Sequence, residues 1–141
     1  MSALAGRTPR ALDEMFDQPL QTLEWMDKLA ADNRAGGFDA TDWLYQSWAY
    51  QVHDVGGTRG FSGNTSAALE SIAAHTLILA PPLDLFNPAQ CAQAAADAIP
   101  GARLVEIPSV QGHQSATNLK AEDAQFLNEE VGDFLQTLGQ E

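Results

Sequence analysis

The sequence predicts an α/β fold, because two short apolar runs with β-branched residues flank an alanine-rich helical stretch. The runs are residues 76–80 and 103–107, and the helix is expected from about Asn87 to Ile99. A strand, a helix and a strand of this size form a right-handed crossover unit with parallel strands. Asp84 and His113 follow the two strands, so we expect both at one edge of the sheet, where open α/β sheets bind ligands.

Residues 1–55 are predicted to be helical. Thr8-Pro9 is typical of a helix N-cap followed by proline at the first helical position. Pro19 is expected to kink or divide the helix that follows, and Gly36-Gly37 to end it. Asp39 is then expected to begin a second helix, because its side chain can cap free backbone N–H groups.

The second helix carries a cluster of large apolar side chains. They cover more than one face, which is unusual for a helix that packs on one side only. We expect this helix either to be buried on several sides or to form the wall of a substrate cavity. The side chains are Trp43, Leu44, Tyr45, Trp48 and Tyr50.

Residues 56–141 are predicted to form the sheet unit. A glycine-rich loop and a short helix over 65–73 precede the first strand, and a helix over 121–138 closes the chain. Glu122 and Asp123 in its first turn suit the positive end of the helix dipole. Its expected core stripe is Phe126, Leu127, Val131, Phe134, Leu135 and Leu138.

The composition excludes several classes of protein. The net charge is −12 and the seven Lys and Arg residues are scattered, which argues against a nucleic-acid partner. The single cysteine excludes an internal disulfide framework and suits a reducing compartment. No long apolar stretch occurs in the first ten residues, so neither a signal peptide nor a membrane span is expected. These features predict a soluble, cytoplasmic protein.

Asp84 and His113 form the main candidate for chemistry. A carboxylate beside an imidazole fixes its tautomer and leaves the other ring nitrogen free to take a proton from a nucleophile. An acid followed by a histidine is also the end of a Ser…Asp…His order. The alternative is an aspartate that caps a loop and an unrelated surface histidine.

Other polar residues give weaker signals. His53-Asp54 follows the aromatic helix and could contact a ligand, although a histidine is also favourable at a helix C-terminus. His75 begins a strand and is expected to be structural. The three histidines lack metal-ligand spacing, so no metal site is expected. Cys91 has no basic neighbour and is expected to be a packed thiol.

Residues 60–64 resemble a nucleophile elbow, but the match fails. Asn64 stands where the second glycine of the motif should be, and no strand precedes Ser62. We therefore do not expect Ser62 to be a nucleophile. The remaining serines lack the flanking glycines or lie within a helix.

Several motifs in order resemble homoserine O-acetyltransferase-like α/β-hydrolases. They run from the aromatic helix to the loop that contains His113, and the similarity extends from Phe38 to about Ala116. The motifs are residues 38–50 with His53-Asp54-Val55, Ala67–Ile72, Asp84-Leu85-Phe86-Asn87-Pro88, Ile99-Pro100-Gly101-Ala102, and Ile107–His113.

The resemblance implies a partial α/β-hydrolase fold, with a helical lid segment over 1–55 and a C-terminal β-α-β-α portion of the core over 56–141. It also implies that Asp84 is the acid and His113 the base of a catalytic triad. Such enzymes transfer an acyl group from a cosubstrate such as acetyl-CoA to a hydroxyl, or hydrolyse an ester, through an acyl-serine. No bound cofactor is expected. Candidate substrate contacts are Trp43, Trp48, His53, Asp54 and Gln114.

Two departures from this family bear on function. The family often has Gly-His-Asp where this chain has the neutral Gln114, and its early strands and nucleophile elbow have no counterpart here. Two parallel strands leave an unpaired edge. We therefore expect a partner, either a second copy or an N-terminal half-domain that supplies strands and the serine. The alternatives are a non-catalytic remnant that serves as an oligomerisation or ligand-binding module, and a relocated nucleophile at Ser62.

Overall fold

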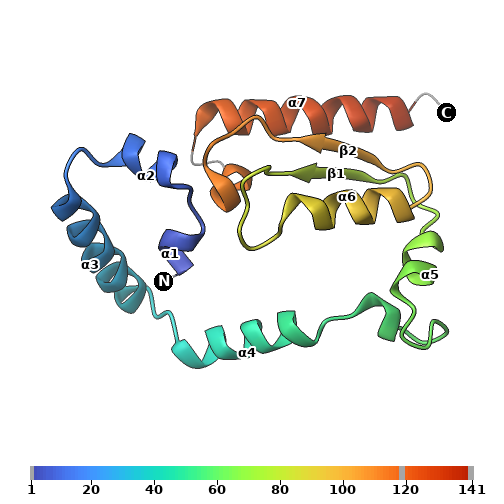
Figure 1. Cartoon of the computed structure of the whole chain (residues 1–141), viewed down its shortest axis with the longest axis horizontal. Coiled ribbons are helices and arrows are strands. Elements are labelled where there is room, and N and C mark those ends of the chain that lie inside the picture. Colours follow the sequence, from blue (N-terminus) through green and yellow to red (C-terminus); the bar gives the residue numbers. More distant parts are fainter. Residues whose placement is uncertain (1, 118–119, 140–141) are drawn as a thin grey trace. The chain divides into compact units, whose positions relative to one another are not determined.

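The computed structural model describes residues 2–117 and 120–139, and it divides into two compact units (Figure 1). Met1–Met15 with Leu69–Glu141 form one, which we call the core unit; Phe16–Ala68 form the other, the helical unit. The boundary expected between residues 55 and 56 falls inside the helical unit. The predicted ranges 1–55 and 56–141 also include residues 1, 118–119 and 140–141, which lie outside the described residues.

The core unit contains a two-stranded parallel sheet, as predicted. Strand β1 (Leu77–Ala80) pairs with β2 (Arg103–Glu106), with Leu77 opposite Arg103 and Ala80 opposite Glu106. Helix α6 (Ala89–Ala98) connects the strands, and it begins directly after Pro88, which occupies its N-cap. A parallel pair requires such a crossover.

Helix α7 (Ala121–Leu138) follows later in the chain, and in Figure 1 the two strands lie between α6 and α7. Helix α6 packs against both strands, whereas α7 packs against β1 and the short helix η2 (Gly112–Ala116). The predicted apolar stripe of α7 is only partly covered, because Val131 and Leu135 are exposed. A sheet of two strands is too narrow to cover the whole face of a long helix.

The N-terminal residues of the core unit form α1 (Ser2–Ala5) and α2 (Pro9–Met15). The prediction for the start of α2 is confirmed, since the Ala11 N–H donates to Thr8 Oγ1 at 3.0 Å and Pro9 follows this cap. Two alanines and two isoleucines are the buried apolar side chains among the described residues of this unit: Ala11, Ala80, Ile99 and Ile107.

The helical unit contains α3 (Pro19–Ala35), α4 (Ala40–Val52), the short helix η1 (Val55–Gly57) and most of α5 (Thr65–Glu70). Pro19 divides the first helical pattern into α2 and α3, as predicted. The cap of α4 is also confirmed, because the Thr41 N–H donates to Asp39 Oδ1 at 2.7 Å.

The sequence left two alternatives for the aromatic helix, burial on several sides or the wall of a substrate cavity, and the structure contradicts burial. No residue of α4 is buried, and Trp48 is 61% exposed. Trp43 of this helix forms a tilted aromatic pair with Phe38, whose ring centroids lie 6.0 Å apart. Side chains that point outward from several faces cannot all be covered by neighbours on one side.

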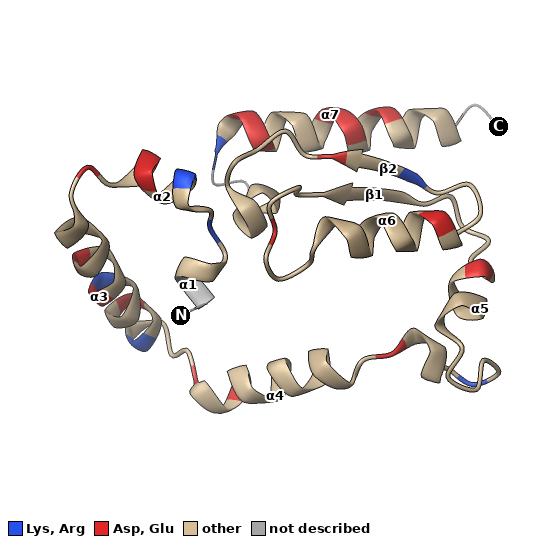
Figure 2. Cartoon of the chain, viewed as in Figure 1, with Lys and Arg blue, Asp and Glu red and all other residues tan. Residues whose placement is uncertain are grey.

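Charged residues are spread over both units (Figure 2). Lys and Arg occur singly, and Asp and Glu recur along α3 and α7. Within the described ranges, none of the helices combines the length and apolarity needed to cross a membrane.

Candidate functional site

Asp84 lies in the loop that leaves the carboxyl end of β1. Its side chain is only 2% exposed. The backbone N–H groups of Phe86 and Asn87 donate to Oδ1 at 2.7 and 3.1 Å. This local turn orients the carboxylate, so that Oδ2 is left for a partner from elsewhere in the sequence.

That partner is His113, in the loop that follows β2. Its Nδ1 lies 2.9 Å from Asp84 Oδ2, and its side chain is 36% exposed. Both residues therefore occur where the sequence predicts them, beyond the carboxyl ends of neighbouring strands.

The pKa of Asp84 is lower than that of an ordinary aspartate. Burial alone would raise this pKa, because it disfavours the charged form. The hydrogen bond from His113 and the backbone N–H groups of Asn87 and Phe86 together outweigh burial. An ionised carboxylate can only accept hydrogen bonds, so Nδ1 of His113 carries the proton and donates. In the neutral imidazole, Nε2 is then a free base.

Phe86 also orients the imidazole. The two rings meet edge to face, with centroids 4.9 Å apart and planes at 69°. Such a contact restricts rotation of the imidazole about its Cβ–Cγ bond, while Asp84 fixes its tautomer.

Gly112 is required by the geometry of the loop before His113. It is buried and has a φ of 61°, in the left-handed region that favours glycine. A Cβ at this position would lie 3.1 Å from the carbonyl oxygen of Leu83. The glycine thus allows the His113 loop to approach the Asp84 loop closely.

Polar groups hold the His113 loop, both to α7 and within the loop itself. Ser109 Oγ donates to Asp123 Oδ2 at 2.7 Å and accepts from the Gln111 N–H at 3.2 Å. Ser115 Oγ donates to the Gly112 carbonyl at 2.8 Å. Buried hydrogen bonds of this kind hold a loop in one conformation, because breaking one leaves a polar group unsatisfied.

The N-terminal segment anchors the same loop from another side. Thr8 Oγ1 donates to the Val110 carbonyl, and the Gln114 N–H donates to the Gly6 carbonyl at 3.2 Å. These bonds explain why the first fifteen residues belong to the core unit.

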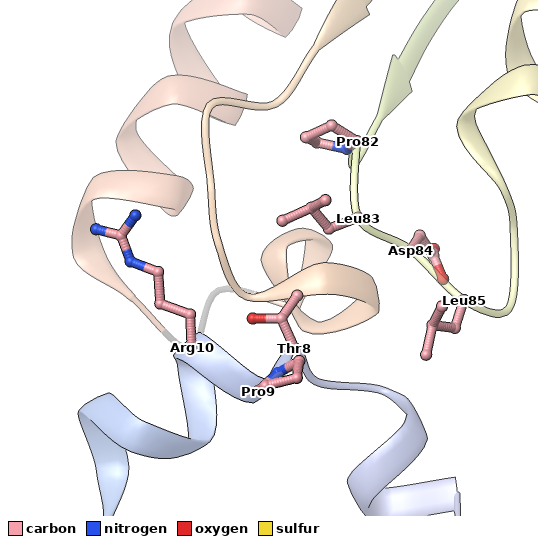
Figure 3. A pocket seen from close by; sticks show the side chains of 7 residues that line it. All are labelled: Thr8, Pro9, Arg10, Pro82, Leu83, Asp84 and Leu85. Atoms are coloured by element: carbon pink, nitrogen blue, oxygen red, sulfur yellow. The ribbon is translucent and has the colours of Figure 1, made fainter.

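A cavity of about 510 Å³ opens beside Asp84 (Figure 3). Residues 8–10 line one side, and Pro82, Leu83 and Leu85 line the other with Asp84. The Arg10 guanidinium points away from Asp84 in Figure 3, so the inner walls are mostly apolar.

The remaining predicted site residues do not join this pair in the core unit, apart from Gln114, which is next to His113 in η2. Trp43 and Trp48 lie on α4, and His53 is its C-cap residue. Asp54 has a structural role in the helical unit, because its Oδ1 accepts from the Gly56 N–H at 2.8 Å and from Thr65 Oγ1 at 2.9 Å. An open depression of about 660 Å³ is lined by Gln46, Ala49, Tyr50 and His53.

Ser62 and Cys91 are the remaining candidate nucleophiles. Ser62 belongs to the helical unit and has a φ of 53°, and no strand precedes it in residues 2–61. Cys91 is exposed on α6, so the prediction of a packed thiol was wrong. The less exposed positions of α6 are all alanines, and Cys91 lies outside them between Gln90 and Ala92. Across the described ranges, no three His, Cys, Asp or Glu side chains are placed to hold a metal ion.

Sequence reasoning missed the groups that hold the histidine loop. The cap signal at Thr8 was visible, but not the bond from its hydroxyl to Val110. Asp123 was explained by the helix dipole, whereas its buried carboxylate accepts from Ser109. Gly112 next to the histidine was the one available signal for a close backbone approach.

Comparisons with known proteins find similar solved structures but no similar sequence family. No protein-family model matches this chain, and no curated protein sequence does. The structure is similar to that of an acetylester hydrolase from Corynebacterium glutamicum, with a TM-score of 0.61 and 26% sequence identity. The match covers 66% of this chain and 26% of the hydrolase chain.

This chain therefore spans about a quarter of the length of that hydrolase. The similarity supports a hydrolase-like, partial α/β fold, which agrees with the two parallel strands and their crossover helix.

Proposed function

We propose that this chain supplies the acid and the base of a serine ester hydrolase or acyltransferase related to homoserine O-acetyltransferases. The observation that supports this most is the 2.9 Å contact between Asp84 and His113 in a fold similar to an acetylester hydrolase. The carboxylate is ionised and buried, and the histidine is accessible. A general base needs this combination.

In the proposed reaction, Nε2 of His113 removes the proton from a serine hydroxyl as its oxygen attacks the ester carbonyl. The imidazolium then gives this proton to the departing alcohol or thiol, leaving an acyl-serine. A second hydroxyl, from water or an acceptor alcohol, is then deprotonated by the same nitrogen as its oxygen attacks the acyl carbonyl. The bond between the acyl group and the serine oxygen breaks, and the imidazolium returns the proton to that oxygen. Asp84 stabilises the imidazolium throughout.

The nucleophilic serine would come from outside the core unit. Ser109 and Ser115 donate their hydroxyl hydrogens to Asp123 and Gly112, and Ser115 is fully buried. We propose that an N-terminal half-domain of hydrolase type supplies the serine and the oxyanion donors, and that the chain alone is inactive. Donors for the oxyanion contribute a large part of the rate in acyl transfer.

For the acyl donor we propose a short-chain ester or acyl-CoA, such as acetyl-CoA. The cavity beside Asp84 has apolar walls and suits a small acyl group. Gln114 beside His113 is neutral, so an acceptor alcohol that carries a free amino group would find no counter-charge there.

The proposal is tested by complementation. We call the Corynebacterium acetylester hydrolase without the segment matched by this chain the truncated hydrolase. The expected result is p-nitrophenyl acetate hydrolysis by the mixture but by neither component alone. His113→Gln and Asp84→Asn should abolish it, and His75→Gln should not. A mixture that never turns over would contradict the proposal.

Two alternatives give other results. The positive φ of Ser62 supports it as a relocated nucleophile, in which case the chain alone would react with a fluorophosphonate probe and Ser62→Ala would not. The exposed aromatic residues of α4 support a non-catalytic oligomerisation or ligand-binding module, in which case no mixture would hydrolyse the ester.

A further inference from the structure

We propose that the free edge of β1 is a docking edge for a strand that runs parallel to it, supplied by the polypeptide that carries the nucleophile. The identity of this partner rests on the proposed function. The edge itself rests on the backbone geometry and the charge distribution of the core unit.

The hydrogen bonds between the strands show which residues face outward. The Arg103 N–H donates to the Thr76 carbonyl and the Ile107 N–H to the Ala80 carbonyl, at 2.9 and 3.0 Å. Backbone groups alternate in direction along a strand, so Ile78 also faces β2. The N–H and C=O groups of Leu77 and Leu79 point the other way, where the described residues provide no strand.

The two strands differ in their charged residues, as an outer strand and an inner strand of a sheet do. Strand β2 carries exposed charged residues at both ends, Arg103 and Glu106, whereas β1 carries none (Figure 2). Charges along an outer strand discourage further pairing, and strands inside a parallel sheet are continuously apolar. The charges therefore mark β2 as the outer strand and β1 as an inner strand with one edge unpaired.

Helix α7 supports the same assignment. It packs against β1, while its Val131 and Leu135 remain exposed. These two residues are one helical turn apart, so they lie on one face of the helix. Leu77, Ile78 and Leu79 are only half-buried, although β1 contacts both α6 and α7. A third strand beside β1 would bury the side chains of β1 further.

The catalytic pair determines the direction of the added strand. Asp84 and His113 lie beyond the carboxyl ends of β1 and β2. Only a parallel strand ends at this edge and can bring a following loop to Nε2 of His113. A second copy of this chain, paired across a two-fold axis, would run antiparallel and place its own Asp84 and His113 at the opposite edge. We therefore assign the edge to a partner strand of hydrolase type and not to a second copy.

Amide hydrogen exchange tests the free edge. In the isolated chain, Leu77 and Leu79 should exchange fast while Ile78 and Ala80 are protected, independently of protein concentration. Addition of the truncated hydrolase should give a one-to-one complex in which Leu77 and Leu79 become protected.

Proline variants test the docking directly. Leu77→Pro removes an outward N–H at the first position of a strand, where proline is tolerated. It should weaken binding of the truncated hydrolase about tenfold or more, as expected for a lost interstrand bond and a steric block. Glu106→Pro is the matched control, because it removes an outward N–H from β2, and it should leave binding unchanged. Leu79→Pro gives a second test if Leu77→Pro loses the protection of Ile78.

Several results would overturn the docking edge: no complex with the truncated hydrolase, equal binding by Leu77→Pro, or protection of Leu77 and Leu79 that appears with chain concentration alone. Catalysis is read separately. A complex that protects β1 but hydrolyses no ester would remove the proposed function and leave the docking edge. Ester hydrolysis that Leu77→Pro leaves unchanged would remove the docking edge and leave the proposed function.

Discussion

Asp84 accepts three hydrogen bonds, from His113 Nδ1 and from the backbone N–H groups of Phe86 and Asn87. All three favour the ionised carboxylate over the neutral acid. The same contacts that prepare His113 as a base therefore also stabilise the fold, and they do so only while Asp84 is ionised.

The pH dependence of stability follows from this. The pKa of Asp84 is lower in the folded chain than in the unfolded one, so folding favours the ionised form. Asp84 therefore contributes to the unfolding free energy fully above its unfolded pKa. This contribution is lost as the pH falls below about 4 towards the pKa of Asp84 in the folded chain. We expect the unfolding free energy of the core unit to decrease over this pH range. In Asp84→Asn this decrease should be smaller. Urea titrations at several pH values measure this. Asp133→Asn, on the exposed side of α7, is the control, and an equal effect there would contradict the assignment.

A second residue-scale prediction concerns Gly112. Gly112→Ala places a Cβ 3.1 Å from the Leu83 carbonyl at a φ of 61°. We expect a loss of about 1–3 kcal/mol in unfolding free energy. The His113 side-chain resonances should shift as well, because the loop must move. Gly132→Ala is the matched control: it lies inside α7 with open space at its Cβ, and it should stabilise by about 0.5–1 kcal/mol. A neutral Gly112→Ala would show that the loop tolerates displacement.

At the scale of elements, the N-terminal helix is a support for the histidine loop. Thr8 caps α2 and also donates to Val110, so a single hydroxyl joins two elements distant in sequence. Thr8→Val keeps the shape but removes both hydrogen bonds.

We expect Thr8→Val to cost about 0.5–2 kcal/mol of stability, the range for loss of a helix cap. Thr8→Ser should restore most of it, because the hydroxyl is retained. The His113 resonances should move in Thr8→Val and return in Thr8→Ser. If the stability changes while His113 stays unperturbed, the segment caps α2 without supporting the loop.

For the aromatic helix α4, we expect a substitution to change the stability little. Trp43 and Trp48 are 46% and 61% exposed. Trp48→Ser should therefore change the unfolding free energy by less than about 0.5 kcal/mol, as is usual for surface positions. In the unsubstituted chain, Trp48 should show the red-shifted fluorescence and ready acrylamide quenching of a water-exposed indole. A blue-shifted, protected Trp48 would mean that α4 is covered.

At the scale of the whole molecule, the two units differ in how much they bury. The helical unit has no buried residue in α3 or α4, whereas the core unit buries Ile107, Ile99 and the polar groups under the histidine loop. Regions with few buried apolar contacts open at low free energy.

We therefore expect the units to unfold at different urea concentrations. All three tryptophans, Trp25, Trp43 and Trp48, lie in the helical unit, so their fluorescence reports this unit alone. Amide protection of β1 and β2 reports the core unit. The fluorescence transition should come first, and coincident transitions would contradict independent units.

The elements could largely be predicted from the sequence, because their signals are local. The two β-branched runs, the alanine-rich helix between them and the caps at Thr8 and Asp39 each need only neighbouring residues. The order of the elements then places the ends of parallel strands at one edge of the sheet. This order predicts Asp84 and His113 at the same edge, whereas their contact was predicted from the resemblance to a known family.

Tertiary structure decided the features that depend on distant residues. The hydroxyl of Thr8 reaches Val110, Asp123 accepts from Ser109, and Gly112 lets one loop approach another. Only Gly112, next to the histidine, gave a signal for such an approach; the bonds from Thr8 to Val110 and from Ser109 to Asp123 have none within their own segments. The exposure of α4 also depends on distant residues. Apolar periodicity shows that a helix can be covered, but not whether a neighbour covers it. The sequence by itself thus determined which elements form and which edge of the sheet carries the acid and the base. Only the folded chain decided how the histidine is held and which strand edge stays open, because both depend on groups brought together from far apart in the sequence.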